Sequence, residues 1–318
     1  MSFILETCEP FMPMLTGDFT MQNETKMKKQ NKLLGTVLLL ICSMIWGTAF
    51  VSQSLGMESV EGFTFSGIRI LLGGICLIPV VLIVNKGKID KKSVLSGLIL
   101  SIPFCIASNV QQYAFNYTPA GKISFITAGY MFFVPIFSLL LKRKIPPVTW
   151  LFVLLGFVGL YFLCIGENGF GTVNRGDVLS LVCAVFFAVQ ILLVEKFSDM
   201  DGVTLSCTQF ISAGLISCVL MLVFEEPRIE NIKAAAFPIL YAGIMSCGVA
   251  YTLQILGQKH TPSTVASLLM CTESVFGAVS SALILGERLS AREIIGCSIM
   301  IVATVLSQIF PLRKGEPS

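Results

Sequence analysis

The sequence predicts an all-α integral membrane protein whose ten transmembrane helices form two inverted five-helix repeats. Three observations support this fold class. The 318 residues are 54% hydrophobic and only 13% charged, with a mean hydropathy of +0.83, which excludes an ordinary soluble domain and a disordered chain. The apolar residues gather in ten runs of membrane-spanning length. Two stretches of the first half of the chain also recur in the second half.

Each apolar run has close to the roughly 20 residues that a helix needs to cross a bilayer. The predicted spans are 33–55, 63–84, 94–113, 119–141, 147–165, 177–195, 203–224, 235–257, 262–285 and 291–310. The third is the least regular, because Pro103 interrupts it and Asn109, Gln111 and Gln112 make its end polar. Proline is tolerated in a membrane helix where neighbouring helices satisfy the freed carbonyl.

The stretches Tyr117–Pro146 and His260–Ser290 are two copies of one helix. Both contain a Thr-Pro pair at the start, and Tyr130 falls where Glu273 falls, 143 residues later. Glu273 lies about 16 Å into its helix at a rise of ~1.5 Å per residue. A charge at that depth costs about 2.5–3.5 kcal/mol on insertion scales, so we expect Glu273 to face protein or water.

The first helix is repeated as well. GTVLLLIC at 35–42 matches GDVLSLVC at 176–183 in five of eight positions, and Trp46 then aligns with Phe187. Each unit holds five helices, an odd number, so the second unit must enter the membrane from the opposite side. We expect an N-terminal tail at 1–31, a first repeat at 32–166, a second repeat at 174–310 and a C-terminal tail at 311–318.

The basic residues set the expected orientation. Fifteen lysines and arginines fall on one side of the predicted membrane and six on the other, with Arg69 inside a helix. Cytoplasmic loops are enriched in these residues. We therefore expect both termini in the cytoplasm, and the absence of a cleavage site after a short apolar core argues against a signal peptide.

Enzyme chemistry finds no support in the sequence. Eleven cysteines are scattered singly through apolar runs, and one histidine, His260, cannot make a multi-histidine metal site. We find no carboxylate pair with metal spacing, no nucleophile elbow and no phosphate-binding loop, since GENGFG at 166–171 reads as a turn. We expect no metal, no cofactor, no nucleic-acid partner and no nucleotide-driven transport.

Polar side chains recur on the predicted third helix. Ser101, Cys105, Ser108 and Gln112 share one face, and in the second copy Tyr251 and Gln254 fall where Ser108 and Gln111 fall. Such a stripe either bonds to neighbouring helices, the commoner case, or lines a wet cavity. Two equivalent stripes favour the cavity. Its predicted substrate-binding residues are Trp46, Gln53, Asn109, Gln112, Tyr130, Gln190, Tyr251 and Gln254, with Phe50 and Phe187 completing an aromatic wall.

Two charges lie deep in the predicted bilayer, and both are candidates for coupling or for a buried structural role. Arg69 is about two turns from the outer face, where a long side chain can alternatively snorkel to the interface. Glu273 lies too deep in its helix to reach the interface in this way. It can be paired, neutral or a proton carrier.

These residues resemble the drug/metabolite transporter superfamily, and within it the EamA-type transporters. The matching motifs are WGTAF at 46–50, Arg69, the Thr-Pro pair at 261–262, Glu273 in CTESVFGAV, and LGERLSAREIIG at 285–296. The resemblance covers residues 33–310. Two departures stand out: Lys142-Arg143-Lys144 replaces an acidic turn, and the first repeat has Tyr130 in place of a second deep carboxylate.

The resemblance implies a secondary transporter of the plasma (inner) membrane that exports small organic metabolites such as amino acids by alternating access. The alternatives are a carrier of nucleotide sugars or phosphate esters, an integral-membrane enzyme acting on lipid-linked substrates, and a membrane scaffold. Phosphate esters would require several cationic side chains in the cavity, and the short loops disfavour the last two. The expected partners are a small-molecule substrate and the lipid bilayer, and a homodimer remains open.

Overall fold

The structure is a computed structural model. Ten helices in the part of the chain that it describes are long and apolar enough to cross a membrane. It describes residues 12–165, 169, 173–284 and 288–309, with side chains from residue 31 onward. The spans are Asn31–Met57, Gly62–Val84, Lys91–Ala114, Ala120–Leu140, Pro147–Cys164, Arg175–Lys196, Gly202–Phe224, Ala236–Gln258, Ser263–Ile284 and Ala291–Ile309. Each differs from one predicted span by at most three residues at either end, so the ten-helix prediction is confirmed.

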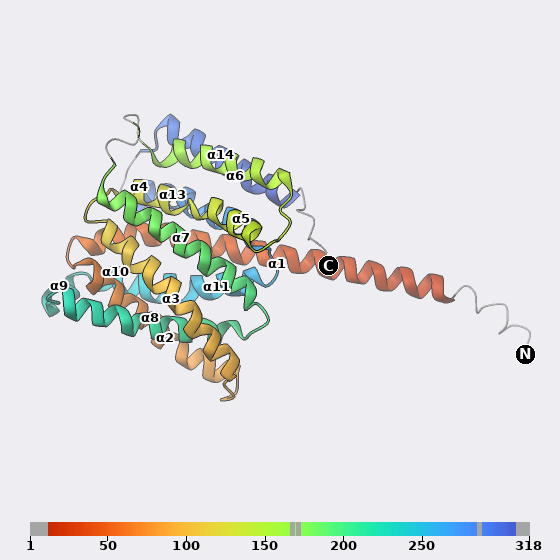
Figure 1. Cartoon of the computed structure of the whole chain (residues 1–318), viewed down its shortest axis with the longest axis horizontal. Helices are drawn as coiled ribbons and strands as arrows, with labels where there is room; N and C mark the ends of the chain where they lie inside the picture. Colours follow the sequence, from red (N-terminus) through yellow and green to blue (C-terminus); the bar gives the residue numbers. More distant parts are fainter. Residues whose placement is uncertain (1–11, 166–168, 170–172, 285–287, 310–318) are drawn as a thin grey trace, which may run out of the picture.

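The helices follow one another without strands among the described residues. They are α1 (Met12–Met57), α2 (Gly62–Val84), α3 (Lys91–Ala114), α4 (Ala120–Thr127), α5 (Tyr130–Leu140), α6 (Pro147–Cys164), α7 (Arg175–Lys196), α8 (Gly202–Phe224), α9 (Ile229–Ala234), α10 (Ala236–Leu240), η1 (Tyr241–Ala250), α11 (Tyr251–Gln258), α12 (Ser263–Met270), α13 (Glu273–Ile284) and α14 (Ala291–Ile309). The N-terminal part of α1 extends beyond the bundle (Figure 1). The predicted C-terminal tail, most of the GENGFG loop and Gly286-Glu287 lie outside the described residues.

The two helices that open with Thr-Pro are each broken near the middle. Pro119 and Pro262 are their N-cap residues, with the extended backbone that proline favours before a helix. The first helix breaks between α4 and α5 at Ala128-Gly129, and the second between α12 and α13 at Cys271-Thr272. At both breaks, backbone bonds tighten to an i→i+3 pattern, as in Gly129 N to Ile126 O (3.0 Å) and Thr272 N to Leu269 O (3.2 Å).

The eighth span is irregular in a different way. Ten of its residues, Tyr241–Ala250, form a π-helix between the short helix α10 and α11. A π-helix is wider than an α-helix, is rare, and occurs frequently at functional sites. Here it contains Gly243 and Gly248 and packs against α2 and α1.

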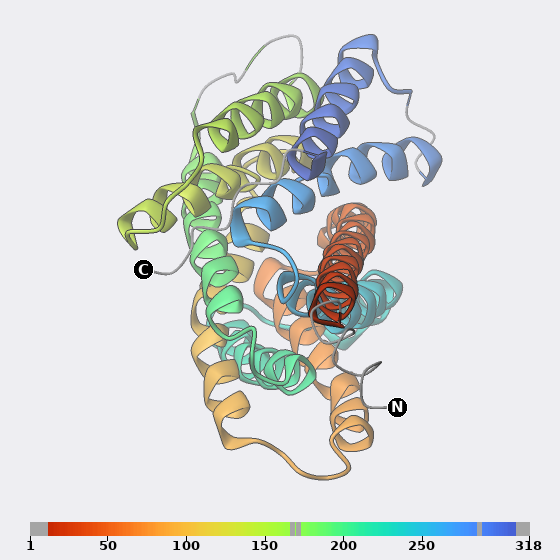
Figure 2. The same ribbon diagram turned by 90° about the vertical axis from the view of Figure 1, so that its right-hand side faces the viewer.

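The bundle is assembled from closely packed helix pairs (Figures 1 and 2). α2 packs on α8 and α6 on α14 at opposite edges of the bundle, and α1 lies between them against α11, η1 and α13. Small residues permit these contacts: a Cβ at Gly47 of α1 would lie 2.6 Å from the carbonyl oxygen of Glu273 and the amide nitrogen of Gly277 on α13. Such backbone contact is typical of membrane helix interfaces.

Several contacts agree with the repeat alignment, either because one contact is the counterpart of another or because a contact joins two aligned positions. A Cβ at Gly35 would collide with Thr261 Oγ1, and a Cβ at the aligned Gly176 would collide with Thr118 Oγ1, the partner of Thr261 in the alignment. At the two breaks, Cys271 Sγ donates to the carbonyl of Ala128 at 3.6 Å, and these two residues are aligned positions 143 residues apart. The broken helices therefore meet at their breaks.

Candidate functional site

A polar cavity lies where the two broken helices meet α1, α2, α3, α7 and the eighth span. Its walls are made by Trp46, Phe50, Gln53, Arg69, Ser108, Gln111, Thr127, Tyr130, Phe187, Gln190, Ile191, Ser246, Tyr251, Gln254, Met270 and Glu273. All but two of the predicted site residues are in this set. The exceptions are Asn109 and Gln112.

Asn109 and Gln112 lie on other faces of α3. The Asn109 amide donates to the Cys105 carbonyl at 2.8 Å and to Ser217 Oγ on α8 at 2.7 Å, so it joins two helices. Gln112 is fully buried, and no partner of its amide is found among the described residues. Gln111 takes their place on the cavity wall, donating to Thr127 Oγ1 at 3.4 Å. The alignment of Gln111 with Gln254 was the signal that could have identified it.

Amide side chains form a second part of the wall, between α7 and α11. Gln254 Nε2 donates to Gln190 Oε1 at 3.3 Å and to Gln258 Oε1 at 3.0 Å. Gln258 in turn donates to the Ile191 carbonyl at 3.0 Å, which fixes the chain of amides to the backbone of α7. One acceptor, Gln254 Oε1, and one donor, Gln190 Nε2, have no partner among the described residues.

Two contacting rings of the aromatic wall come from α1 and α11. The rings of Trp46 and Tyr251 have centroids 4.5 Å apart, and Tyr251 makes edge contacts with Phe104 at 5.0 Å and Phe210 at 5.3 Å. These contacts hold the two cavity-facing rings in fixed orientations. Trp46 Nε1 and the neighbouring Gln53 Oε1 are buried and have no partner in the described residues.

The two deep charges both reach the cavity. Glu273 is 5% exposed, and its Oε1 accepts a hydrogen bond of 3.3 Å from the Tyr130 hydroxyl, which joins the two aligned positions across the broken helices. Arg69 is 3% exposed and donates to Ser108 Oγ at 2.8 Å. The alternative that Arg69 snorkels to the interface is therefore wrong, because the side chain is buried and lines the cavity.

A second cavity reaches Glu273 from one end of the bundle. It is lined by Phe50, Val51, Ser54, Ala120, Gly121, Ser124, Leu163, Cys164, Glu273, Ser274, Gly277, Ala278, Ser281, Leu289 and Glu293. It shares Phe50 and Glu273 with the first cavity. Between α4 and α13, Ser124 and Ser274 are joined by a hydrogen bond of 2.9 Å along its wall.

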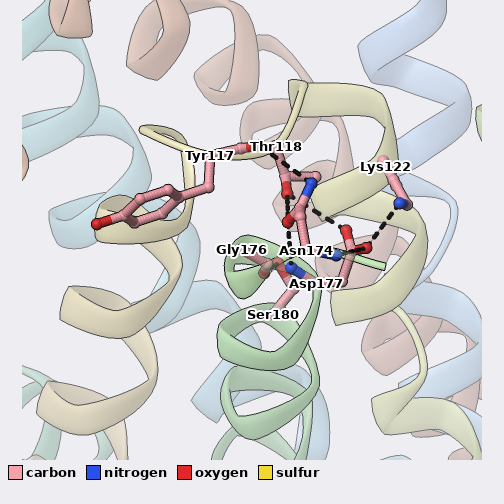
Figure 3. A network of polar contacts seen from close by, with 7 residues as sticks. All are labelled: Tyr117, Thr118, Lys122, Asn174, Gly176, Asp177 and Ser180. Atoms are coloured by element: carbon pink, nitrogen blue, oxygen red, sulfur yellow. Dashed lines mark hydrogen bonds and ion pairs between the residues drawn. The ribbon is translucent and has the colours of Figure 1, made fainter. Parts of the chain in front are cut away.

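A polar network holds the start of α4 against the start of α7 at this end (Figure 3). Lys122 Nζ lies 2.7 Å from Asp177 Oδ2, and Thr118 Oγ1 donates to Asn174 Oδ1 at 2.6 Å and to Asp177 Oδ1 at 3.2 Å. Asn174 and Asp177 also form a capping box at the start of α7. We call these four residues the α4–α7 network.

Comparison with known proteins gives one family and a set of relatives. The model of the EamA-like transporter family matches residues 33–165 and 174–308. An uncharacterized transporter of Archaeoglobus fulgidus is 27% identical over 281 residues, covering 86% of each chain, and the uncharacterized transporter YoaV of Bacillus subtilis is 21% identical, covering 87% of this chain and 97% of its own. The threonine/homoserine exporter RhtA of Salmonella typhimurium is 24% identical over 171 residues, or 54% of this chain and 58% of RhtA. One crystal structure superposes with a TM-score of 0.74 at 16% identity, covering 89% of this chain and 99% of that chain, and has the same fold.

Proposed function

Because the chain belongs to the EamA-like transporter family, and is thus a multi-pass membrane transporter of a small molecule, we propose that it exports amino acids or related metabolites across the plasma membrane. Both termini lie in the cytoplasm, and the cavity between the broken helices is the substrate site. The observation that carries the proposal is this cavity, which combines amide, aromatic and charged side chains at the middle of the spans. The threonine/homoserine exporter among the relatives supports the substrate class.

Two inverted five-helix repeats, 32–166 and 174–310, provide the mechanism of alternating access. The repeats are supported by contacts between aligned positions: a residue that touches its own equivalent must lie close to the axis relating the two halves. Tyr130 with Glu273 and Ala128 with Cys271 are two such contacts. Interrupted helices that meet near the midplane at a repeat interface are a recurring feature of secondary transporters.

The α4–α7 network belongs to the outer end of the bundle in this orientation. It ties the first half of the first broken helix to α7. The exposed ion pair of Arg143 with Glu195 belongs to the inner end. Glu195 also accepts a hydrogen bond from Ser263 Oγ of α12 at 2.6 Å. Export requires these two sets of contacts to loosen alternately, so that the cavity opens to one side at a time.

Glu273 is the residue that couples substrate movement to protons in this proposal. Among the described residues it is the one carboxylate on the wall of the first cavity, and the second cavity gives it access from the outer end. Replacement by glutamine keeps the size of the side chain and an acceptor for the Tyr130 hydroxyl while removing the titrating group.

Radiolabelled L-threonine and L-homoserine, loaded into proteoliposomes of purified protein, test the proposal with and without a proton gradient. We expect gradient-driven movement by the wild type, retained exchange but no gradient-driven movement by Glu273→Gln, and wild-type behaviour by the control Glu58→Gln, an exposed carboxylate outside the first cavity. Movement of a sugar phosphate instead of amino acids would refute the substrate class. Gradient-driven movement by a well-expressed Glu273→Gln protein would refute its coupling role.

A further inference from the structure

Arg69 is a buried cation without a carboxylate partner in the described part of the chain. The ion pairs found there join Lys122 to Asp177 and Arg143 to Glu195, and neither involves Arg69. An unpaired charge inside a membrane protein is costly, and such charges face a protein interior or a wet cavity where they serve a function. Arg69 meets this description because its side chain lines the first cavity.

The groups around the guanidinium are all neutral. Ser108 Oγ accepts from Nη2 at 2.8 Å, and Cys247 Sγ, a weak acceptor, lies 3.7 Å from Nη1. The guanidinium carbon lies 5.7 Å from the centre of the Phe65 ring, a further neutral contact. Nε is buried and has no acceptor among the described residues. The hydrogen-bonding capacity of Arg69 is therefore incompletely used.

The π-helix η1 fixes the position of this side chain. A Cβ at Gly243 would lie 2.9 Å from the carbonyl oxygen of Arg69, so α2 and η1 approach each other at backbone distance. The wide turns of η1 then direct Ser246 to the cavity wall and Cys247 to the guanidinium. The close packing of α2 on η1 therefore holds the arginine in place at the cavity wall, where its Nε has no acceptor among the described residues.

We propose that Arg69 binds the carboxylate of the transported solute. The inference rests on the proposed function in that the ligand is the transported molecule. A guanidinium presents parallel N–H donors that match the two oxygens of a carboxylate, and it binds that group more tightly than neutral acceptors. Gln53 Oε1 and Gln254 Oε1 accept no hydrogen bond from the described residues. With Glu273, they are available on the same cavity wall for the amino group of the solute.

The fluorescence of Trp46 reports binding directly. The chain has two tryptophans, so Trp150→Phe leaves Trp46 as the reporter on the cavity wall. Titration with L-threonine and with L-threoninamide, which lacks the carboxylate, measures the contribution of that group in purified protein. We expect the acid to bind about 30-fold or more tightly than the amide, the range for a buried charge-assisted contact.

Arg69→Gln in the same background should bring the acid and the amide to within about threefold of each other, and Arg69→Lys should retain part of the preference because it keeps the charge. Arg228→Gln is the matched control, because it removes an exposed guanidinium outside both cavities, and it should keep the full preference. Equal affinity for acid and amide in the Trp150→Phe protein, or no response to either, would overturn the proposal without requiring that any Arg69 variant folds. An undiminished preference in Arg69→Gln would overturn it as well.

Transport in vesicles separates this inference from the proposed function. Movement of threonine and threoninamide at the same rate would leave the proposed function intact and refute the role of Arg69. A different outcome is that Trp46 fluorescence responds to the carboxylate only when Arg69 is present, while the protein moves no amino acid across the vesicle membrane. That result would support the binding site and refute export.

Discussion

Removing the carboxylate of Asp177 tests how strongly the α4–α7 network holds the first broken helix in place. Asp177 accepts hydrogen bonds from Lys122 Nζ at 2.7 Å, from Thr118 Oγ1 at 3.2 Å and from the backbone N–H of Asn174 at 3.0 Å. The side chains of Lys122 and Asp177 are 14% and 8% exposed. Asp177→Asn keeps the size of the side chain and an acceptor for the amide, but it removes the charge that Lys122 meets.

The burial of the Lys122–Asp177 pair sets the expected loss of unfolding free energy. Breaking a fully buried pair from one side costs about 3–5 kcal/mol, whereas exposed pairs contribute about 0–1 kcal/mol. Lys122 and Asp177 lie close to the buried limit, but a lysine near a helix end can extend its amine toward water when its partner is lost. We therefore expect Asp177→Asn to lower the free energy of unfolding by about 2–3 kcal/mol.

A double-mutant cycle with Lys122→Met isolates the pair from the other bonds of Asp177. Because the double mutant replaces both charged partners with neutral side chains, it leaves no uncompensated charge. We therefore expect a coupling free energy of about 1.5–2.5 kcal/mol in denaturant titrations of the protein in mixed micelles. Arg143 with Glu195, 42% and 27% exposed, serves as the control pair and should give about 0–1 kcal/mol. A coupling below about 0.5 kcal/mol for Lys122 and Asp177 would refute the reasoning, since the pair would then behave as a solvated one.

Three further predictions follow from packing, cavity position and titration. Gly47→Ala should destabilise the protein by about 1–3 kcal/mol in the same titration, because its Cβ would press on the α13 backbone, whereas Gly277→Ala has 3.5 Å to its nearest neighbour and should be tolerated. In a cysteine-free protein, Gln254→Cys should react with a water-soluble thiol reagent and Gln112→Cys should not; the opposite order would contradict the cavity assignment. Burial raises the pKa of Asp201, but hydrogen bonds from Thr204 and Asn85 outweigh it and lower that pKa overall. The contribution of Asp201 to stability is complete above the unfolded-state pKa of roughly 4 and is lost as the pH falls through the lower folded-state value. In Asp201→Asn, the melting temperature should therefore depend less on pH below about pH 4 than in the wild type.

The ten spans could be predicted because hydropathy and length report directly on the bilayer. Their ends needed no tertiary information, since proline and polar residues mark them. The breaks at Ala128-Gly129 and Cys271-Thr272 carry no comparable signal: the first has a glycine and the second has none. They exist because backbone groups freed there are satisfied by tight turns and by the facing helix, as with Cys271 and the Ala128 carbonyl.

The polar face of α3 shows where periodicity stops being informative. A period of 3.6 residues correctly groups Ser108 with its neighbours, but it does not reveal which neighbouring helix each one faces. Cys105 and Asn109 turn to Ser217 of α8, while Ser108 and Gln111 turn to the cavity.

The repeat carries the missing information about α3. Tyr251 and Gln254 are the equivalents of Ser108 and Gln111, and all four line the cavity. Asn109 aligns instead with Thr252, which bonds to Ser206 of α8 at 3.0 Å, so that a position joining helices in one half also joins helices in the other. A side chain that faces the axis between two related halves has an equivalent that faces the same axis. In a duplicated transporter, comparing aligned positions therefore separates cavity residues from residues that join helices, which a single helical stripe does not.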